Sequence, residues 1–156
     1  MPSRERQTAD TMVAAFNTMD TATIISLRTP TCQRIIRPSS LKYPPQSNTA
    51  YLANLNSMKS IFTNFHITVN DVIEGSRVDA DGKESTTIVM FVEAQGDTPM
   101  GEYRNEYVWK MAFEEGGARI DEWLEYVDVG MARDFYPKLA GEMKRRTQEN
   151  TEKVKG

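Results

Sequence analysis

Four segments rich in β-branched and aromatic residues follow one another in the second half of this chain. They cover residues 65–73, 85–95, 102–113 and 118–127, which are lengths typical of β-strands. The sequences between them, EGSRVDADGK, GDTPMG and EEGG, carry the glycine, proline and aspartate residues that form turns. Because short turns join consecutive antiparallel strands, this half of the chain predicts a four-stranded meander.

The first half of the chain predicts helices. Apolar residues recur at helical spacing between residues 4 and 19, and Asp20 suits the N-cap of a short second helix. Residues 32–37 predict a short strand, and residues 48–62 predict a third helix with Asn48 as its cap. Helices followed by strands indicate an α+β fold in which three N-terminal helices cover one face of the sheet. Strong curvature would turn that face into a cone with an apolar interior.

The length indicates a single domain over residues 1–156, with its core between about residues 4 and 137. Asp128 is expected to cap a C-terminal helix over residues 129–139, and residues 141–156 predict a charged, frayed tail. The hydrophobic content of 39% and the charged content of 26% are typical of a soluble globular protein.

The composition argues against several classes of function. A net charge of −3 gives no electrostatic reason to expect a nucleic-acid partner. With Cys32 as the single cysteine an internal disulfide is excluded, and with His66 as the single histidine a zinc site of the usual kind is not expected. No apolar run approaches the roughly 20 residues of a membrane span, and the N-terminus lacks the apolar core of a signal peptide. We therefore expect a cytoplasmic protein without membrane contacts, metal or cofactor.

The predicted strand over residues 103–113 has large side chains on both of its faces, which is more than one buried face requires. A homodimer that packs sheet against sheet would cover the second face. The residues concerned are Tyr107, Trp109, Met111 and Phe113 on one face and Val108 and Ala112 on the other.

The closing pattern G-x-Y-R-N-E-Y-V-W … I-x-x-W-x-E-Y-V-D resembles the SnoaL-like branch of the nuclear transport factor 2-like superfamily. More narrowly, FTNFHITVNDV followed by DTPMGEYRNEYVWKMAF is similar to small fungal isomerases of secondary metabolism. Those enzymes act on meroterpenoid or xanthone intermediates without a cofactor. The resemblance covers roughly residues 4–137. It implies a dimer whose cone-shaped sheet holds one hydrophobic polycyclic small molecule.

The resemblance also implies catalytic carboxylates. In related enzymes the acid at the position of Glu125 faces the cavity, and an acid on the neighbouring strand acts with it; Glu106 or Glu93 would fill this second place. The branch usually has Asp or His at these positions, so the roles of the glutamates stay open. Strand alternation alone also allows Glu106 to pair with Arg104 or Lys110 as solvated surface charge.

Two further candidates are His66 and Arg37. Histidine titrates near neutral pH, which suits proton transfer, but alternation places His66 on the less apolar face of its strand, where a non-catalytic histidine is commoner. Arg37 ends a strand and suits the binding of a carbonyl or enolate oxygen; an exposed charge is the alternative. Together with Arg37, the residues expected to contact the substrate are Glu93, Trp123, Phe16, Met12 and Met58.

These residues predict a cofactor-independent isomerase or cyclase. A carboxylate would remove a proton next to a carbonyl group, with Glu106 as the base or acid and with Glu125 and His66 completing the relay. Arg37 or a protonated partner would hold the enolate-like intermediate. One alternative is hydrolysis or water addition by the same carboxylates, of the epoxide-hydrolase type. The other is a non-enzymatic module that binds hydrophobic ligands.

Overall fold

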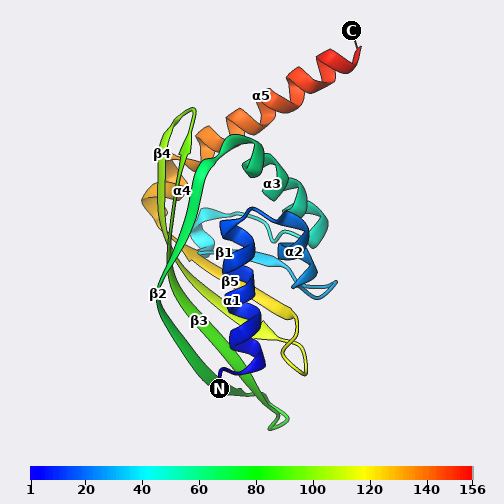
Figure 1. Ribbon diagram of the computed structural model, residues 1–156, viewed down its shortest axis with the longest axis vertical. Coiled ribbons are helices and arrows are strands. Elements are labelled where there is room, and N and C mark those ends of the chain that lie inside the picture. Colours follow the sequence, from blue (N-terminus) through cyan, green and yellow to red (C-terminus); the bar gives the residue numbers. More distant parts are fainter. Residues whose placement is uncertain (156) are drawn as a thin grey trace.

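The computed structural model describes residues 1–155, and its fold is of the expected α+β class with one curved sheet (Figure 1). Five strands lie in the order β1-β5-β4-β3-β2. The short strand β1 (Arg34–Arg37) pairs in parallel with the last strand, so a segment from the first half of the chain closes that edge. The other strands form the predicted antiparallel meander: β2 (Thr63–Val78), β3 (Glu84–Thr98), β4 (Gly101–Phe113) and β5 (Ile120–Val127).

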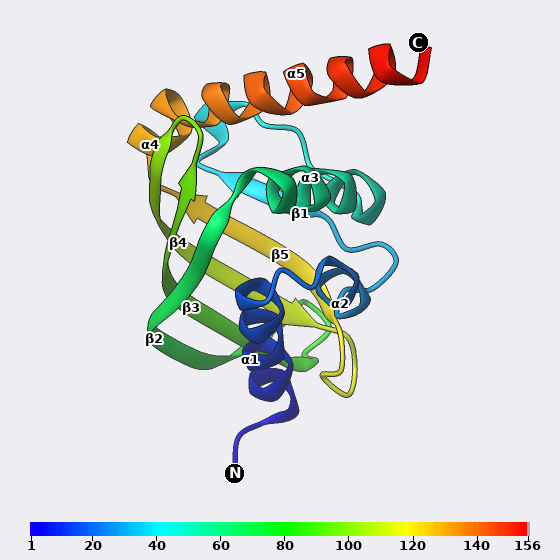
Figure 2. The same ribbon diagram turned by 45° about the horizontal axis from the view of Figure 1, so that its top comes forward.

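The helices of the first half cover one face of the sheet, as predicted (Figure 2). Asp20 caps the second of them, also as predicted. The cap of the third is Ser47 rather than Asn48, because the Ser47 hydroxyl accepts a hydrogen bond from the N–H of Ala50 at 3.2 Å. The three helices are α1 (Arg4–Asn17), α2 (Thr21–Ser26) and α3 (Asn48–Ile61), and a 3₁₀ turn, η1 (Ser39–Leu41), follows β1.

The C-terminal segment differs from its prediction. Helix α4 (Val129–Asp134) begins at the predicted cap, Asp128, but a longer helix, α5 (Tyr136–Lys155), then continues to the end of the described chain. The sequence predicts a charged, frayed tail over residues 141–156, and residues 141–155 lie within α5.

Two kinds of contact explain why α5 is longer than expected. Glu142 accepts hydrogen bonds from Arg145 and Arg146, and pairs at this spacing stabilise a helix. Arg146 also donates to the carbonyl oxygen of Ser60 near the end of α3, and Met143 packs against the main hydrophobic core. The helix is thus tied to the body of the protein beyond its first turn.

The space between the sheet and the helices is the hydrophobic core. Alternation along the strands places Met90, Met111 and Trp123 on the helix side, and each is at most 1% exposed. Met12 from α1 and Leu55 from α3 are each 1% exposed and belong to the same cluster. We call the covered side of the sheet the inner face and the opposite side the outer face.

Candidate functional site

Glu125 lies on the inner face of β5 and is only 3% exposed. A buried carboxylate is unfavourable unless hydrogen bonds and an opposite charge surround it. Arg34 supplies both, since its Nε donates to Oε1 at 2.7 Å and its Nη2 donates to Oε2 at 3.1 Å. The indole Nε1 of Trp123 donates to the same Oε1 at 3.0 Å. Both carboxylate oxygens are therefore engaged within the protein.

The parallel pairing of β1 with β5 brings Arg34 to this carboxylate, because the register sets Arg34 opposite Trp123. Burial by itself lowers the pKa of the Arg34 guanidinium, but the charge and hydrogen bonds of Glu125, together with the nearby phenols of Tyr51 and Tyr136, raise it by more, so the net shift is upward. The group therefore stays charged although its side chain is only 12% exposed. Its Nη1 donates to Oε1 of Gln46 at 2.9 Å.

Beside Arg34 the inner face opens into a cavity of about 230 Å³ between β1, α3 and α5. An apolar wall with a few convergent polar groups is typical of small-molecule sites. Gln46 and Asn54 contribute amide groups to the wall. The apolar part of the wall includes Ile36, Pro44, Met58, Leu139 and Met143.

Three tyrosine side chains meet at the wall of this cavity. Tyr103 and Tyr107 come from the inner face of β4, where their hydroxyl groups are hydrogen-bonded to each other, and Tyr136 begins α5. Asn105 lies between the two strand tyrosines and is 3% exposed. Its Nδ2 donates to the hydroxyl oxygen of Tyr103 at 2.9 Å and to that of Tyr136 at 2.8 Å.

Burial raises the pKa of all three of these phenols. For Tyr103, hydrogen bonds from its neighbours oppose part of that rise in pKa. The three groups are therefore neutral hydroxyls that can donate a proton at physiological pH. Burial also raises the pKa of Tyr51 to about 12, and the ring of Tyr51 lies 4.9 Å from the guanidinium carbon of Arg34.

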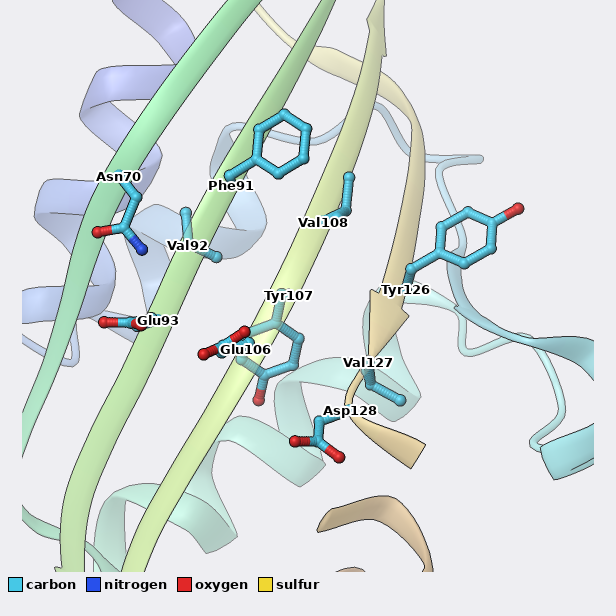
Figure 3. A pocket seen from close by; sticks show the side chains of 10 residues that line it. All are labelled: Asn70, Phe91, Val92, Glu93, Glu106, Tyr107, Val108, Tyr126, Val127 and Asp128. Atoms are coloured by element: carbon cyan, nitrogen blue, oxygen red, sulfur yellow. The ribbon is translucent and has the colours of Figure 1, made fainter. Parts of the chain in front are cut away.

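The other two predicted acids, Glu93 and Glu106, lie on the outer face, as Figure 3 shows. Glu93 of β3 and Glu106 of β4 are direct neighbours across the two strands, and both are exposed. They border an open depression of about 450 Å³. The expectation that Glu106 shares a cavity with Glu125 is wrong, because alternation turns Glu106 away from the face that holds Tyr107. A catalytic role for Glu106 in the inner cavity has no support from this position.

His66 and Arg37 also lie apart from the cavity. His66 is exposed on β2 and stands opposite Gln95 of β3, on the less apolar side that alternation predicts for it. Arg37 is paired with the outward-facing Tyr126 and is not part of the cavity wall. The arginine at the cavity is Arg34, which begins β1 and points to the inner face.

The predicted apolar contacts divide between core and cavity. Met58 is part of the cavity wall. Met12, Phe16 and Trp123 are buried in the core, at 1%, 6% and 1% exposed, and none of them is part of the cavity wall. Their packing supports the site from behind, since the rings of Phe16 and Trp123 both pack at a tilt against Trp109.

Sequence reasoning missed the polar groups that the cavity does contain. One face of β4 is formed by every second residue: Tyr103, Asn105, Tyr107, Trp109 and Met111. A polar amide on this otherwise apolar face was a visible signal. No comparable signal marks Arg34 or Tyr136, because their place depends on how distant segments pack.

Within residues 1–155, no group of three His, Cys, Asp or Glu side chains is placed to hold a metal ion. Cys32 is 1% exposed, and burial raises the pKa of its thiol, so it is not a reactive thiolate. None of the helices in this part of the chain has both the length and the apolar character needed to cross a membrane.

Comparison with known proteins finds a relative of similar extent. The chain is 30% identical over 132 residues to the austinoid biosynthesis clusters protein H of Penicillium brasilianum. The alignment covers 84% of this chain and 86% of that protein. No family model matches the chain.

Solved structures share the fold. The structure of AusH from Aspergillus nidulans has a TM-score of 0.66 at 26% identity, covering 81% of this chain and 87% of that one. The BvnE pinacolase from Penicillium brevicompactum has a TM-score of 0.73 at 21% identity, covering 90% and 96%. A SnoaL-like chain from Shewanella denitrificans OS-217 has a TM-score of 0.60 at 12% identity, covering 86% and 97%.

Proposed function

This chain belongs to the family of the austinoid biosynthesis clusters protein H, within the SnoaL-like proteins, and we propose that it is an isomerase-type enzyme of secondary metabolism. In this proposal it rearranges a polycyclic meroterpenoid or polyketide intermediate without a cofactor. The names of its relatives support the assignment, since they concern austinoid biosynthesis and a pinacolase. The cavity on the inner face supports it independently, from geometry.

The observation that carries the proposal is a set of hydrogen-bond donors along one wall of an apolar cavity. Arg34 is held by Glu125 and Gln46, which together occupy three of its N–H groups. A guanidinium has five such groups, so two are left to donate to a ligand. Tyr136 adds a neutral phenol to the same wall. Fixed donors of this kind stabilise negative charge that develops on a carbonyl oxygen, most strongly where water is excluded.

The mechanism that follows is activation of a carbonyl group by hydrogen bonding. The ring system of the substrate lies against the apolar wall near Met58 and Leu139, and its carbonyl oxygen accepts from Arg34 and Tyr136. Polarisation makes the carbonyl carbon electron-poor and so promotes migration of a substituent, with its bonding electrons, from the neighbouring carbon. A hydroxyl group on that neighbouring carbon then becomes the new carbonyl, and its proton passes to the oxygen of the former carbonyl. Because burial raises the pKa of Tyr136, this phenol keeps its proton and donates a hydrogen bond to the oxygen throughout the rearrangement.

The carboxylate has a different role here from the one expected from the sequence. The described residues that line the cavity include neither Asp nor Glu. Glu125 stands behind Arg34, and both its oxygens accept hydrogen bonds from protein groups. We therefore assign Glu125 a positioning role, in which it fixes the guanidinium of Arg34 without touching the ligand.

The test uses the intermediate that accumulates in the producing organism when this gene is deleted. Wild-type protein is expected to convert it into a product of the same mass, without incorporation of labelled oxygen from water. Tyr136→Phe should lower turnover by about a hundredfold, the usual effect of losing one such donor. Glu122→Gln, on the outer face of β5, is the matched control and should leave turnover unchanged.

Two other outcomes would replace the proposal. A product that has gained one labelled oxygen from water would identify a hydratase or hydrolase of the epoxide-hydrolase type. Binding of the intermediate without any conversion, in wild type and variants alike, would identify a binding module.

We also propose that two copies pair through the outer face, which gives the homodimer expected from the sequence. Phe91, Val108 and Tyr126 lie in register across β3, β4 and β5. Phe91 is 38% exposed and Tyr126 is 48% exposed, so the outer face carries an uncovered apolar row at its centre. Figure 3 shows these three side chains on the same side of the sheet. A second copy of this sheet presents the same apolar row and would cover it.

A further inference from the structure

Asn105 lies at the centre of the tyrosine cluster, and its neighbours fix the orientation of its amide. The Oδ1 atom accepts from the backbone N–H of Asp128 at 3.3 Å, and this N–H also donates to the carbonyl oxygen of Glu106 at 3.2 Å. Because a backbone N–H can only donate, an NH₂ group turned to this side would face another donor. The amide oxygen must therefore be on that side and the NH₂ group on the other. There its Nδ2 donates to both Tyr103 and Tyr136, which uses both N–H groups of the amide. Asn105 is 3% exposed, so bulk water does not compete for these bonds.

The orientation of Asn105 excludes one direction for the hydroxyl proton of Tyr136. The Tyr136 oxygen receives an N–H from Asn105, and Tyr107 is a further hydrogen-bond neighbour. A phenol has a single proton, and that proton cannot be directed at an NH₂ group that is itself donating. The proton can therefore go only to the oxygen of a neighbouring phenol, Tyr103 or Tyr107, or to an acceptor in the cavity that Tyr136 lines.

Gln46 follows the same logic on the other side of the cavity. The guanidinium of Arg34 only donates, so the oxygen of the Gln46 amide must face it, as the 2.9 Å bond from Nη1 to Oε1 shows. The NH₂ group of Gln46 is then the part of this amide left for a ligand. Arg34, Gln46 and Tyr136 thus all present donors. Asn54 adds an amide that can donate or accept.

We infer that Asn105 is a positioning residue that turns the polar wall of this cavity into a donor wall, and that the site selects ligands with an acceptor oxygen on an apolar polycyclic body. The class of ligand is a ketone, an ester carbonyl or an enolate. An alcohol of the same shape brings a proton that finds few acceptors on this wall, and an unmatched buried donor is unfavourable. This inference deepens the proposed function and rests on it for its catalytic meaning, although ligand binding can be tested without turnover.

The test uses three tricyclic probes of nearly the same shape. They are 9-fluorenone, which only accepts, 9-fluorenol, which also donates, and fluorene, which does neither. Dissociation constants are measured by calorimetry or by quenching of tryptophan fluorescence. Wild-type protein is expected to bind fluorenone about tenfold more tightly than either of the other probes, the usual effect of one well-placed hydrogen bond.

Asn105→Asp reverses the central hydrogen bonds with little change in shape. An aspartate carboxylate only accepts, so the hydroxyls of Tyr103 and Tyr136 turn their protons toward it and away from the ligand. We expect the tenfold preference for fluorenone over fluorenol to fall to about one or to reverse, while fluorene binding changes by less than about threefold. A merely structural role for Asn105 would weaken the binding of all three probes together. Asn70→Asp, on an exposed position of β2, is the matched control and should leave all three constants unchanged.

Tyr136→Phe keeps the test decisive if Asn105→Asp fails to fold. This variant removes the donor itself and should also lose the preference for fluorenone. Equal binding of ketone and alcohol by wild-type protein would overturn the inference, and so would binding of none of the probes or a preference that persists in both variants. A ketone preference without conversion of the pathway intermediate would remove the proposed enzyme and leave the donor wall. Conversion of the pathway intermediate without a preference for the ketone probe would remove the donor wall and leave the proposed enzyme.

Discussion

The inner and outer faces of the sheet are built from the same strands, yet the ion pairs on the two faces have opposite environments. On β5, Glu125 of the inner face is 3% exposed and pairs with Arg34 at 2.7 Å. Three residues earlier, Glu122 of the outer face pairs with Arg77 at 3.4 Å, and these two side chains are 37% and 48% exposed. The inner pair orients a guanidinium beside an apolar cavity, whereas the outer pair is solvated. The neighbours of a carboxylate, more than its place in a pattern, decide what it can do.

Breaking the inner ion pair should have the largest effect. Arg34→Met leaves the charge of Glu125 buried without a partner, so we expect the free energy of unfolding to fall by about 3–5 kcal/mol. Urea denaturation at neutral pH measures this change. Adding Glu125→Gln removes the isolated charge and should restore much of the lost stability. A double variant no more stable than Arg34→Met would mean that lost packing, rather than charge, causes the effect.

Alkaline pH should act on the inner face through its buried phenols. Burial raises the pKa of Tyr51 from 10.0 to about 12, so the folded protein holds this proton more tightly than the unfolded chain. The resulting stability is fully present below pH 10 and is lost as the pH rises toward 12. For this one group the loss is about 2–3 kcal/mol. Urea denaturation at several pH values across this window measures it, and Tyr51→Phe should show a shallower fall.

A charge introduced on the outer face should weaken the proposed dimer rather than the folding of each copy. Tyr126→Asp places a charge in the apolar row and should weaken the proposed dimer by about thirtyfold, as expected for a central aromatic contact. Sedimentation analysis measures the shift from dimer to monomer. Val78→Asp, at the exposed end of β2, is the matched control. A wild-type protein that is already monomeric would remove the dimer and leave the account of the inner site untouched.

The smallest effect should come from the outer ion pair. Glu122→Gln removes a solvated charge whose interaction with Arg77 is screened by water, so the free energy of unfolding should change by less than about 1 kcal/mol. The same urea denaturation that is used for Arg34→Met measures it. A loss as large as that of the inner pair would mean that burial does not separate the two faces energetically.

Local patterns in the sequence were enough to predict most of the fold. The four strands of the meander follow from residue type and turn chemistry, and Asp20 and Asp128 cap helices as predicted. The extent of α5 did not follow, because its stability comes from contacts such as Arg146 with Ser60, which are 86 residues apart. Tertiary contacts of this kind cannot be predicted from the sequence of a charged segment alone.

The candidate site was predicted only in part, for a physical reason. Arg34 and Glu125 are 91 residues apart and meet through a parallel strand pairing, for which the sequence has no turn or spacing signal. For Glu106 the alternation along β4 did contain the answer, since the opposite set, with Tyr107 and Trp109, is the more apolar one. The resemblance to related enzymes favoured an inward-facing Glu106. Burial of the aromatic side chains of the opposite set on the inner face instead turns Glu106 outward.

The most direct test of this account compares turnover when each face loses one polar group. Tyr136→Phe removes a donor from the inner cavity, and Glu106→Gln removes a charge from the outer face. With the accumulated pathway intermediate as substrate, the account predicts that the first variant loses about a hundredfold in kcat/KM while the second keeps the wild-type value. Loss of turnover in Glu106→Gln with full activity in Tyr136→Phe would contradict the placement of the active site on the inner face.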